Sequence, residues 1–308
     1  MHNYQTWGAS HTTWYSPDAF CSQNHHADGV HTVTKENFSV NLLLHGNPLQ
    51  TEYDFIPVFF GGAIANRAQL NPPFFSGVAL SKNLRLPSIC VSDPVVENNQ
   101  EVNLAWYAGV PETKFQMRLT ELFKAIAVNS GKKLLFIGGS GGGFASLYYS
   151  VRLPEYSGAL VWNPQTSILN YYSDPVQRFL TAVGVPSSVL HTKNWKSEVR
   201  EWRKGLVDVE LWGSHFLDSN QISIILQNKT DWHLEKHFLP WISTSTWKQR
   251  DTPEASYYAK DDNHLAAVAD FAEGHSPIPL PILNKILSAV IIDKKTAAAA
   301  VSEAVKMI

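Results

Sequence analysis

The sequence contains only two cysteines, Cys21 and Cys90, in 308 residues. Two cysteines cannot build the disulfide framework of a small secreted domain, and a chain of this length does not need one. Cys90 lies in an apolar run, where a free thiol behaves as a small hydrophobic side chain. We therefore expect a reducing compartment and a cytoplasmic location.

Long hydrophobic runs are also missing. The chain has no stretch of about 18 apolar residues, the length that a membrane-spanning helix requires. Its first residues show no basic segment followed by an apolar one. These absences predict neither a membrane span nor a signal peptide.

Neither sign of charge is in excess. The chain has 25 Lys and Arg residues against 27 Asp and Glu residues, a formal net charge of −2. We expect no nucleic-acid partner, because proteins that bind phosphate backbones carry a basic excess. The hydrophobic fraction of 44% excludes a disordered chain and suits one large domain or two smaller ones.

Short apolar runs alternate with segments whose apolar residues recur at helical spacing. The strand-like runs are 55–60, 86–91, 134–137, 159–162 and 221–226, and the helical segments are 112–129, 144–153 and 296–307. Such alternation predicts an α/β fold with a mostly parallel central sheet, right-handed crossovers and helices on both faces. Two earlier runs, 31–34 and 38–44, predict antiparallel strands added at one edge.

The pattern changes between residues 165 and 220, which hold several tryptophans, many charges and helical stretches. We interpret 165–220 as a helical cap inserted into an α/β core whose two parts are 1–164 and 221–308. Trp162, just before the cap, and Tyr171, within it, are candidates for stacking on a sugar ring. The alternative is that these aromatic side chains pack the interior of the cap itself.

The sharpest motif is a glycine-rich turn around Ser140, which matches G-x-S-x-G over residues 138–142. It follows a predicted strand and opens a predicted helix, the context that a nucleophilic serine requires. A serine on so tight a turn tolerates no bulky neighbours, and the helix N-terminus offers free N–H groups to a developing oxyanion. Phe144 does not fit a phosphate-binding or dinucleotide-binding loop. We interpret Ser140 as a nucleophile; the alternative is a structural turn with an ordinary serine.

An activated serine needs a base and an acid that orients the base. In proteins with this turn, the acid follows a later strand and the histidine comes after the acid. Asp231 follows the predicted strand 221–226, and His275 lies on a loop before a predicted helix. We predict that they are the acid and the base. His264 is the competing candidate for the base, and a solvated surface histidine is the alternative for His275.

The oxyanion of the reaction would be bound by backbone N–H groups. One donor should be the residue after the nucleophile, Gly141. The second should come from the loop that follows the predicted strand 55–60, and we choose Gly62 or Ala63. The alternative is that this second loop is an ordinary turn.

His233 follows Asp231 too closely to be the base, and we expect it to line the pocket. With His237 it forms His-x-x-x-His, but the glutamate that follows the first histidine of a zinc-protease helix is replaced by leucine. We therefore predict no metal and no cofactor.

Seven motifs occur in a characteristic order along residues 55–290. They are Phe59-Phe-Gly-Gly-Ala63, Asp93-Pro94, Trp106-Tyr-Ala-Gly109, the turn at Ser140, Trp162-Asn-Pro-Gln-Thr166, Gln227-Asn228 with Asp231-Trp-His233, and Gly274-His-Ser-Pro277. In these motifs the chain resembles the α/β-hydrolase superfamily. More narrowly, it resembles the serine esterases and acyltransferases of bacterial surface-polysaccharide and glycoprotein machinery. The resemblance implies an α/β-hydrolase fold and a triad of Ser140, Asp231 and His275.

The motifs and the resemblance together predict a serine hydrolase that cleaves a carboxylic ester through an acyl-enzyme intermediate. Its substrate would be a small-molecule ester or an acylated carbohydrate. Two alternatives stay open: an O-acyltransferase that modifies a glycan, and a non-catalytic module of a glycan-assembly or secretion complex. The first shares the triad with an esterase, so the sequence does not separate the two.

Overall fold

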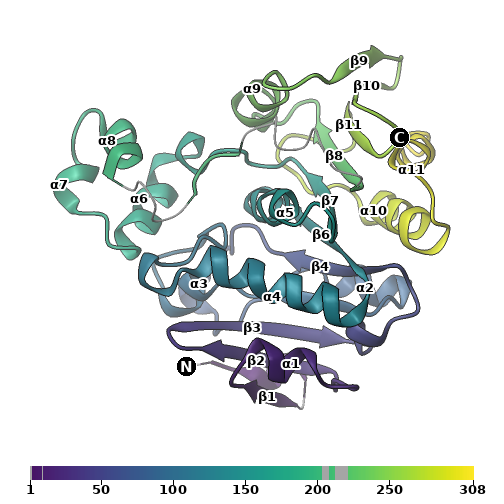
Figure 1. The fold of residues 1–308 in the computed structure, drawn as a ribbon. Helices are drawn as coiled ribbons and strands as arrows, with labels where there is room; N and C mark the ends of the chain where they lie inside the picture. Colours follow the sequence, from purple (N-terminus) through teal and green to yellow (C-terminus); the bar gives the residue numbers. More distant parts are fainter. Residues whose placement is uncertain (1, 9, 203–207, 212–220) are drawn as a thin grey trace.

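The computed structural model describes residues 2–8, 10–202, 208–211 and 221–308, with Trp202 described by its backbone only. Within these residues the strands form one 11-stranded sheet, in the order β1-β2-β3-β5-β4-β6-β7-β8-β11-β10-β9 (Figure 1). The strands are β1 (His11–Trp14), β2 (Gly29–Lys35), β3 (Phe38–His45), β4 (Phe55–Phe60), β5 (Ser88–Val91), β6 (Lys133–Gly139), β7 (Ser157–Trp162), β8 (Ser223–Asn228), β9 (Lys248–Asp251), β10 (Ala255–Ala259) and β11 (His264–Ala269).

The centre of the sheet is parallel. Strands β5, β4, β6, β7, β8 and β11 run in one direction, each beside the next. At one edge β2 and β3 pair antiparallel, as predicted, although β1 then pairs parallel to β2. At the other edge β10 and β9 add antiparallel strands that the sequence analysis did not predict.

A proline occupies the central strand β4, where a missing N–H group would normally break a ladder. Pro57 pairs with Leu135 of β6, whereas the pairing of β4 with β5 begins one residue later, at Val58. The edge of Pro57 that faces β5 therefore lies outside the paired segment, and the proline is tolerated.

Helices cover both faces of this sheet. They are α1 (Pro17–Cys21), α2 (Val78–Leu84), α3 (Pro94–Asn98), α4 (Phe115–Ser130), α5 (Gly141–Arg152), α6 (Ser173–Ala182), α7 (Ser187–Leu190), α8 (Trp195–Trp202), α9 (Leu239–Ile242), α10 (Leu280–Leu287) and α11 (Ala297–Val305). Helices α1, α3, α4 and α5 pack in one hydrophobic cluster, and α2, α10 and α11 pack in a second. In β6, Leu134 and Phe136 belong to the first cluster while Leu135 and Ile137 belong to the second, as the period of a strand requires.

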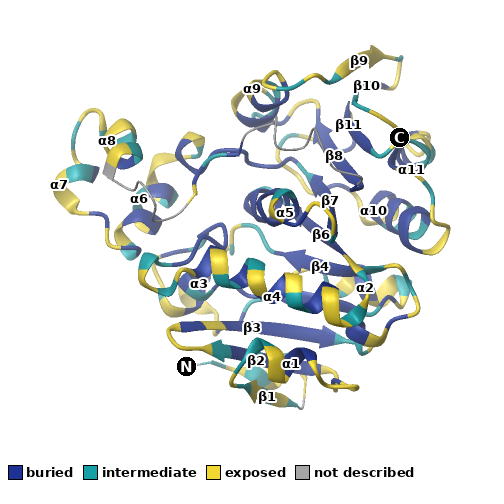
Figure 2. Cartoon of the chain, viewed as in Figure 1, coloured by how far each residue is buried: buried dark blue, intermediate teal, exposed yellow. Residues whose placement is uncertain are grey.

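Burial follows this layering. Figure 2 shows the central strands and α5 in dark blue, and α4 with a buried stripe facing the sheet and an exposed one facing outward. The mostly parallel central sheet with helices on both faces confirms the predicted fold class. Among the described residues, no helix combines the length and the apolar character that crossing a membrane requires.

Helices α6, α7 and α8 follow β7 and extend to one side of the sheet (Figure 1). They occupy much of the range 165–220 that we predicted as a cap; residues 203–207 and 212–220 of that range lie outside the described residues. Phe179 of α6 packs edge-on against Trp106 of the core, with ring centroids 5.4 Å apart. The division of the chain into a core and a cap stays a prediction.

The register of the parallel strands brings four loops to one edge of the sheet. Phe60 of β4 pairs with Gly138 of β6, and Trp162 of β7 pairs with both Gly139 of β6 and Leu226 of β8. The segments that follow β4, β6, β7 and β8 therefore start side by side, and in parallel α/β sheets ligands bind at this carboxyl edge.

Candidate active site

Ser140 stands on the turn between β6 and α5, with φ 54° and ψ −119°. A non-glycine residue with positive φ is strained, by about 1–3 kcal/mol. The turn can be this tight because residue 142 is glycine: a Cβ on Gly142 would clash with the carbonyl oxygen of Phe60. The N-terminus of α5 thus packs directly against the end of β4, and Ser140 is placed at the edge of the sheet.

The structure brings the predicted acid, base and nucleophile together. Nε2 of His275 lies 3.1 Å from Oγ of Ser140, and Nδ1 of His275 lies 2.7 Å from Oδ2 of Asp231. The Asp231 side chain is fully buried, whereas 35% of the His275 side chain is exposed. The histidine therefore connects a buried carboxylate to a serine at an accessible edge.

The hydrogen-bond partners determine the direction of each bond. The Asp231 carboxylate only accepts hydrogen bonds, so the proton of the His275 ring lies on Nδ1. Nε2 is then an acceptor, and the Ser140 hydroxyl donates to it. The backbone N–H of His233 donates to the other carboxylate oxygen of Asp231 at 2.9 Å.

Two asparagines to which the sequence analysis gave no role hold the loop of His275. The side-chain amides of Asn163 and Asn228 donate to the carbonyl oxygen of Ser276 at 3.0 and 2.8 Å. Asn228 also donates to the carbonyl oxygen of Gly274 at 3.0 Å. Asn163 directly follows β7 and Asn228 ends β8, so a polar residue at the end of a buried strand was the available signal.

His264, the competing candidate for the base, lies elsewhere. It is the first residue of β11 and pairs with Ser223, the first residue of β8, so it sits at the amino ends of these strands. Its ring is buried, and Nδ1 lies 2.8 Å from Oδ1 of Asp261. The structure brings His275, and not His264, to Ser140.

The predicted oxyanion donors flank the serine. An ideal Cβ on Gly62 would lie 3.7 Å from Cβ of Ser140, so the loop after β4 runs directly past the nucleophile. The N–H of Gly61 is occupied, because it donates to the Tyr107 hydroxyl at 2.7 Å. In the part of the chain that the structure describes, the N–H groups of Gly62 and Ala63 have no hydrogen-bond partner.

Gly141 begins α5, and the first N–H groups of a helix have no partner within it. Together with the loop after β4, it offers N–H donors on both sides of Ser140. No local pattern in the sequence identifies the role of Tyr107, which holds that loop through Gly61.

A pocket of about 350 Å³ opens at this site. The predicted site residues that line it are Gly62, Ala63, Ser140, Trp162, Tyr171 and His275. His233 does not reach it, since its side chain is fully buried and its ring lies against His275, with centroids 4.2 Å apart. The structure therefore places His233 behind the histidine at the pocket rather than on its wall.

His233 and His237 form a buried pair beside the site. Burial lowers the pKa of His233, and the neighbouring His275 lowers it further, so the ring is neutral at pH 7. Nδ1 of His233 lies 2.8 Å from the carbonyl oxygen of Asn163 and donates to it. Burial likewise lowers the pKa of His237 to about 3, with smaller contributions from His233 and His275.

Three of these side chains offer atoms that could ligate a metal ion. Among the described residues, one donor atom each of Asp231, His233 and His275 lies within 4.8 Å of the other two. Asp231 and His275 already share a hydrogen bond, between Nδ1 of His275 and Oδ2 of Asp231.

Comparisons with known proteins bear on the fold. No protein family model matches the chain, and no curated protein sequence matches it. Among solved structures, the chain is similar to a chain of the glycosylation-associated protein complex of Streptococcus agalactiae, with a TM-score of 0.50 and 13% identity. The similarity covers 86% of this chain and 46% of that chain, so our chain spans less than half of the streptococcal one.

Two further structures are similar over most of their length. The capsule O-acetyltransferase of Neisseria meningitidis serogroup A has a TM-score of 0.49 and 12% identity, over 88% of this chain and 98% of that one. The α/β hydrolase domain-containing protein 10 from mouse has a TM-score of 0.49 and 11% identity, over 86% and 99%. Likeness at such identities concerns the fold alone. The fold that this likeness concerns is the mostly parallel sheet between two helical layers.

Proposed function

We propose that this protein is a serine hydrolase that cleaves carboxylic esters through an acyl-enzyme on Ser140. The observation that carries the proposal is the chain of hydrogen bonds from Asp231 through His275 to Ser140. It ends in a pocket that is also bordered by unpaired backbone N–H groups. A nucleophile, a base, an orienting acid and oxyanion donors are the components that acyl transfer requires.

In the acylation step, Oγ of Ser140 forms a bond to the ester carbonyl carbon, and the hydroxyl proton passes to Nε2 of His275. The carbonyl electron pair moves to its oxygen. When this intermediate collapses, the bond to the alcohol breaks and the alcohol takes the proton from His275. Asp231 keeps the Nδ1 proton in place and stabilises the imidazolium.

The oxyanion formed in each half of the reaction would lie between the loop after β4 and the start of α5. Gly141 would donate from one side and Gly62 or Ala63 from the other. In enzymes where one such donor has been removed, the free-energy barrier of the reaction rises by about 3–4 kcal/mol. Water then attacks the acyl-enzyme, gives a proton to His275, and Oγ of Ser140 leaves with that proton.

An aromatic group beside the pocket supports an acylated carbohydrate as the substrate. Tyr171 lines the pocket and stacks against Trp232, with ring centroids 5.7 Å apart. Tyr172, which is 57% exposed, lies 4.7 Å from the same indole. Accessible aromatic faces next to the nucleophile could contact the apolar face of a sugar ring. A sugar hydroxyl in place of water would turn the same acyl-enzyme into a transferase.

Hydrolysis of p-nitrophenyl acetate tests the proposal, with wild type, Ser140→Ala and Ser150→Ala compared. Ser150→Ala is the matched control, because this buried serine lies in α5 and its hydroxyl donates to Gln221. We expect Ser140→Ala to lose turnover and Ser150→Ala to keep it, with both variants folded by circular dichroism. Turnover that persists in Ser140→Ala would refute the proposal.

An inactive but folded wild type would favour the non-catalytic alternative. If the wild type is active, acetylated glycans and free sugar acceptors distinguish the two enzymatic alternatives. Release of acetate in water indicates an esterase, and acetyl groups that appear on the sugar indicate a transferase.

A further inference from the structure

Oγ of Ser140 has a second hydrogen-bond partner that the mechanism above does not use. The side-chain nitrogen Nε2 of Gln165 lies 3.0 Å from this oxygen. The backbone N–H of Gln165 also donates to the carbonyl oxygen of Ser140 at 3.1 Å. Gln165 lies in the loop after β7 and is fully buried. One residue thus contacts the nucleophile through both its backbone and its side chain.

Trp106 determines which end of the Gln165 amide faces the serine. The indole N–H of Trp106 lies 2.6 Å from Oε1 of Gln165 and can only donate. A flipped amide would set two donors against each other. The amide NH₂ group therefore faces Ser140 and donates to Oγ, while the Ser140 hydroxyl donates to His275.

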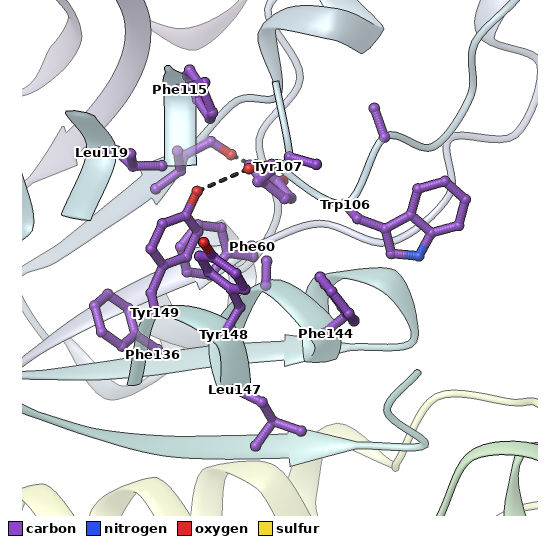
Figure 3. Close-up of a cluster of buried hydrophobic side chains, with 14 of the residues drawn as sticks. Phe60, Trp106, Tyr107, Phe115, Leu119, Phe136, Phe144, Leu147, Tyr148 and Tyr149 are labelled. Atoms are coloured by element: carbon purple, nitrogen blue, oxygen red, sulfur yellow. Dashed lines mark hydrogen bonds between the residues drawn. The ribbon is translucent and has the colours of Figure 1, made fainter. Parts of the chain in front are cut away.

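The loop that carries Trp106 is held in a strained conformation. Trp106 and Tyr107 have φ values of 53° and 54°, in the region that favours glycine. The backbone N–H of Tyr107 donates to the buried Asp93 carboxylate at 2.6 Å. Figure 3 shows that the Trp106 indole extends away from the packed rings of Tyr107 and Tyr149. This conformation keeps the indole N–H on Gln165.

We propose that Gln165 is a catalytic residue of this site, whose amide stabilises Oγ of Ser140 while that oxygen carries negative charge. This inference rests on the proposed role of Ser140 as the nucleophile. Charge develops on Oγ twice: as it loses its proton to His275 and bonds to the ester carbon, and as it leaves the acyl-enzyme and takes the proton back. In both steps the Gln165 amide donates a hydrogen bond and exchanges no atom.

The variant Gln165→Met tests this role, because methionine has a similar length and no donor. Hydrogen bonds to charged groups predict a fall of about 10- to 100-fold in kcat and in the labelling rate by a fluorophosphonate probe. KM should stay within about twofold, since the bond strengthens only as charge develops. Gln165→Glu replaces the donor by an acceptor that competes for the serine proton. At pH 7 its kcat should be no higher than that of Gln165→Met.

Gln221→Met is the matched control. Gln221 is equally buried, and its side chain accepts a bond from Ser150. We expect its kcat to match that of the wild type. If Gln165→Met does not fold, Trp106→Phe decides the question, because it keeps Gln165 and removes the group that orients its amide; its kcat should fall about 3- to 10-fold.

Two results would overturn the inference while leaving the proposed function intact. One is a Gln165→Met enzyme, or in its place a Trp106→Phe enzyme, with kcat and labelling rate within twofold of the wild type. The other is a change confined to KM. A wild type that neither turns over ester nor reacts with the probe would instead overturn the proposed function itself.

Discussion

Removal of one hydroxyl group, in the variant Tyr107→Phe, tests whether catalysis needs the loop after β4 to be anchored. The Tyr107 hydroxyl accepts a hydrogen bond from the N–H of Gly61 at 2.7 Å and donates one to the carbonyl oxygen of Val91 at 3.2 Å. It therefore ties the start of the loop with Gly62 and Ala63 to the end of β5. Phenylalanine keeps the ring in the core and deletes both bonds.

The size of each effect follows from these contacts. Val91 is fully buried, so its carbonyl group loses its donor without replacement, whereas water can reach the half-buried Gly61. An unsatisfied buried group costs about 1–3 kcal/mol, and we expect the free energy of unfolding to fall by that amount. A displacement of about 1 Å in a catalytic group can cost about 100-fold. Because the loosened loop would still occupy its original position part of the time, we expect kcat to fall by about 10-fold.

The assay compares urea unfolding and ester turnover for Tyr107→Phe and for Tyr148→Phe. Tyr148→Phe removes a tyrosine hydroxyl from the same region of the protein (Figure 3). That hydroxyl donates to Asp208 at 3.1 Å and does not touch the loop. We expect Tyr148→Phe to keep its kcat within twofold. The reasoning fails if Tyr107→Phe loses stability and yet turns over ester as fast as Tyr148→Phe.

Two further predictions concern the triad and the buried histidines. Asp231→Asn should lower kcat by about 10⁴-fold, because an amide no longer selects the tautomer of His275 that carries its proton on Nδ1. Circular dichroism should show an intact fold, and a loss of kcat below tenfold would contradict the prediction. Burial holds the pKa of His237 at about 3. Below pH 6.5 the unfolded chain therefore binds a proton that the folded chain does not, and the free energy of unfolding decreases as the pH is lowered. Between pH 7 and pH 5 the protonation of this group should lower the free energy of unfolding by about 2 kcal/mol. Urea unfolding at the two pH values should therefore show a loss of stability that is smaller by this amount in His237→Gln than in the wild type. Equal losses in the two proteins would contradict the prediction.

The fold class and the turn at Ser140 could be predicted because their signals are local. Apolar runs and helical spacing within about twenty residues define the central strands and their helices, and the glycines around Ser140 mark a turn that only small residues permit. Asp231 and His275 were selected by their order along the chain, and only the folded structure provides the distances between them.

The strands after residue 226 were missed for a physical reason. Strand β11 is rich in alanine, which has low β-propensity, and it is buried because β8 and β10 pair on either side of it. Such a strand is stabilised by its neighbours rather than by its own composition. The four residues of β9 are exposed and carry no apolar alternation either.

The residues that support the site were missed because their contacts are long-range. Asn163 reaches the loop of His275 only through the register of β7 with β8. Gln165 reaches Ser140 only because β6 and β7 end together, and its amide is oriented by Trp106, 59 positions earlier in the chain. A polar residue at the end of a buried strand can mark Asn163, but no local pattern identifies the distant residue that it contacts.

The central claim is that Ser140 is an activated nucleophile, and site-mapped labelling with a fluorophosphonate probe tests it most directly. Intact mass should show one adduct on the folded wild type and none on Ser140→Ala, and peptide mapping should locate that adduct on Ser140. An unlabelled wild type, or an adduct on another residue that persists in Ser140→Ala, would contradict the account.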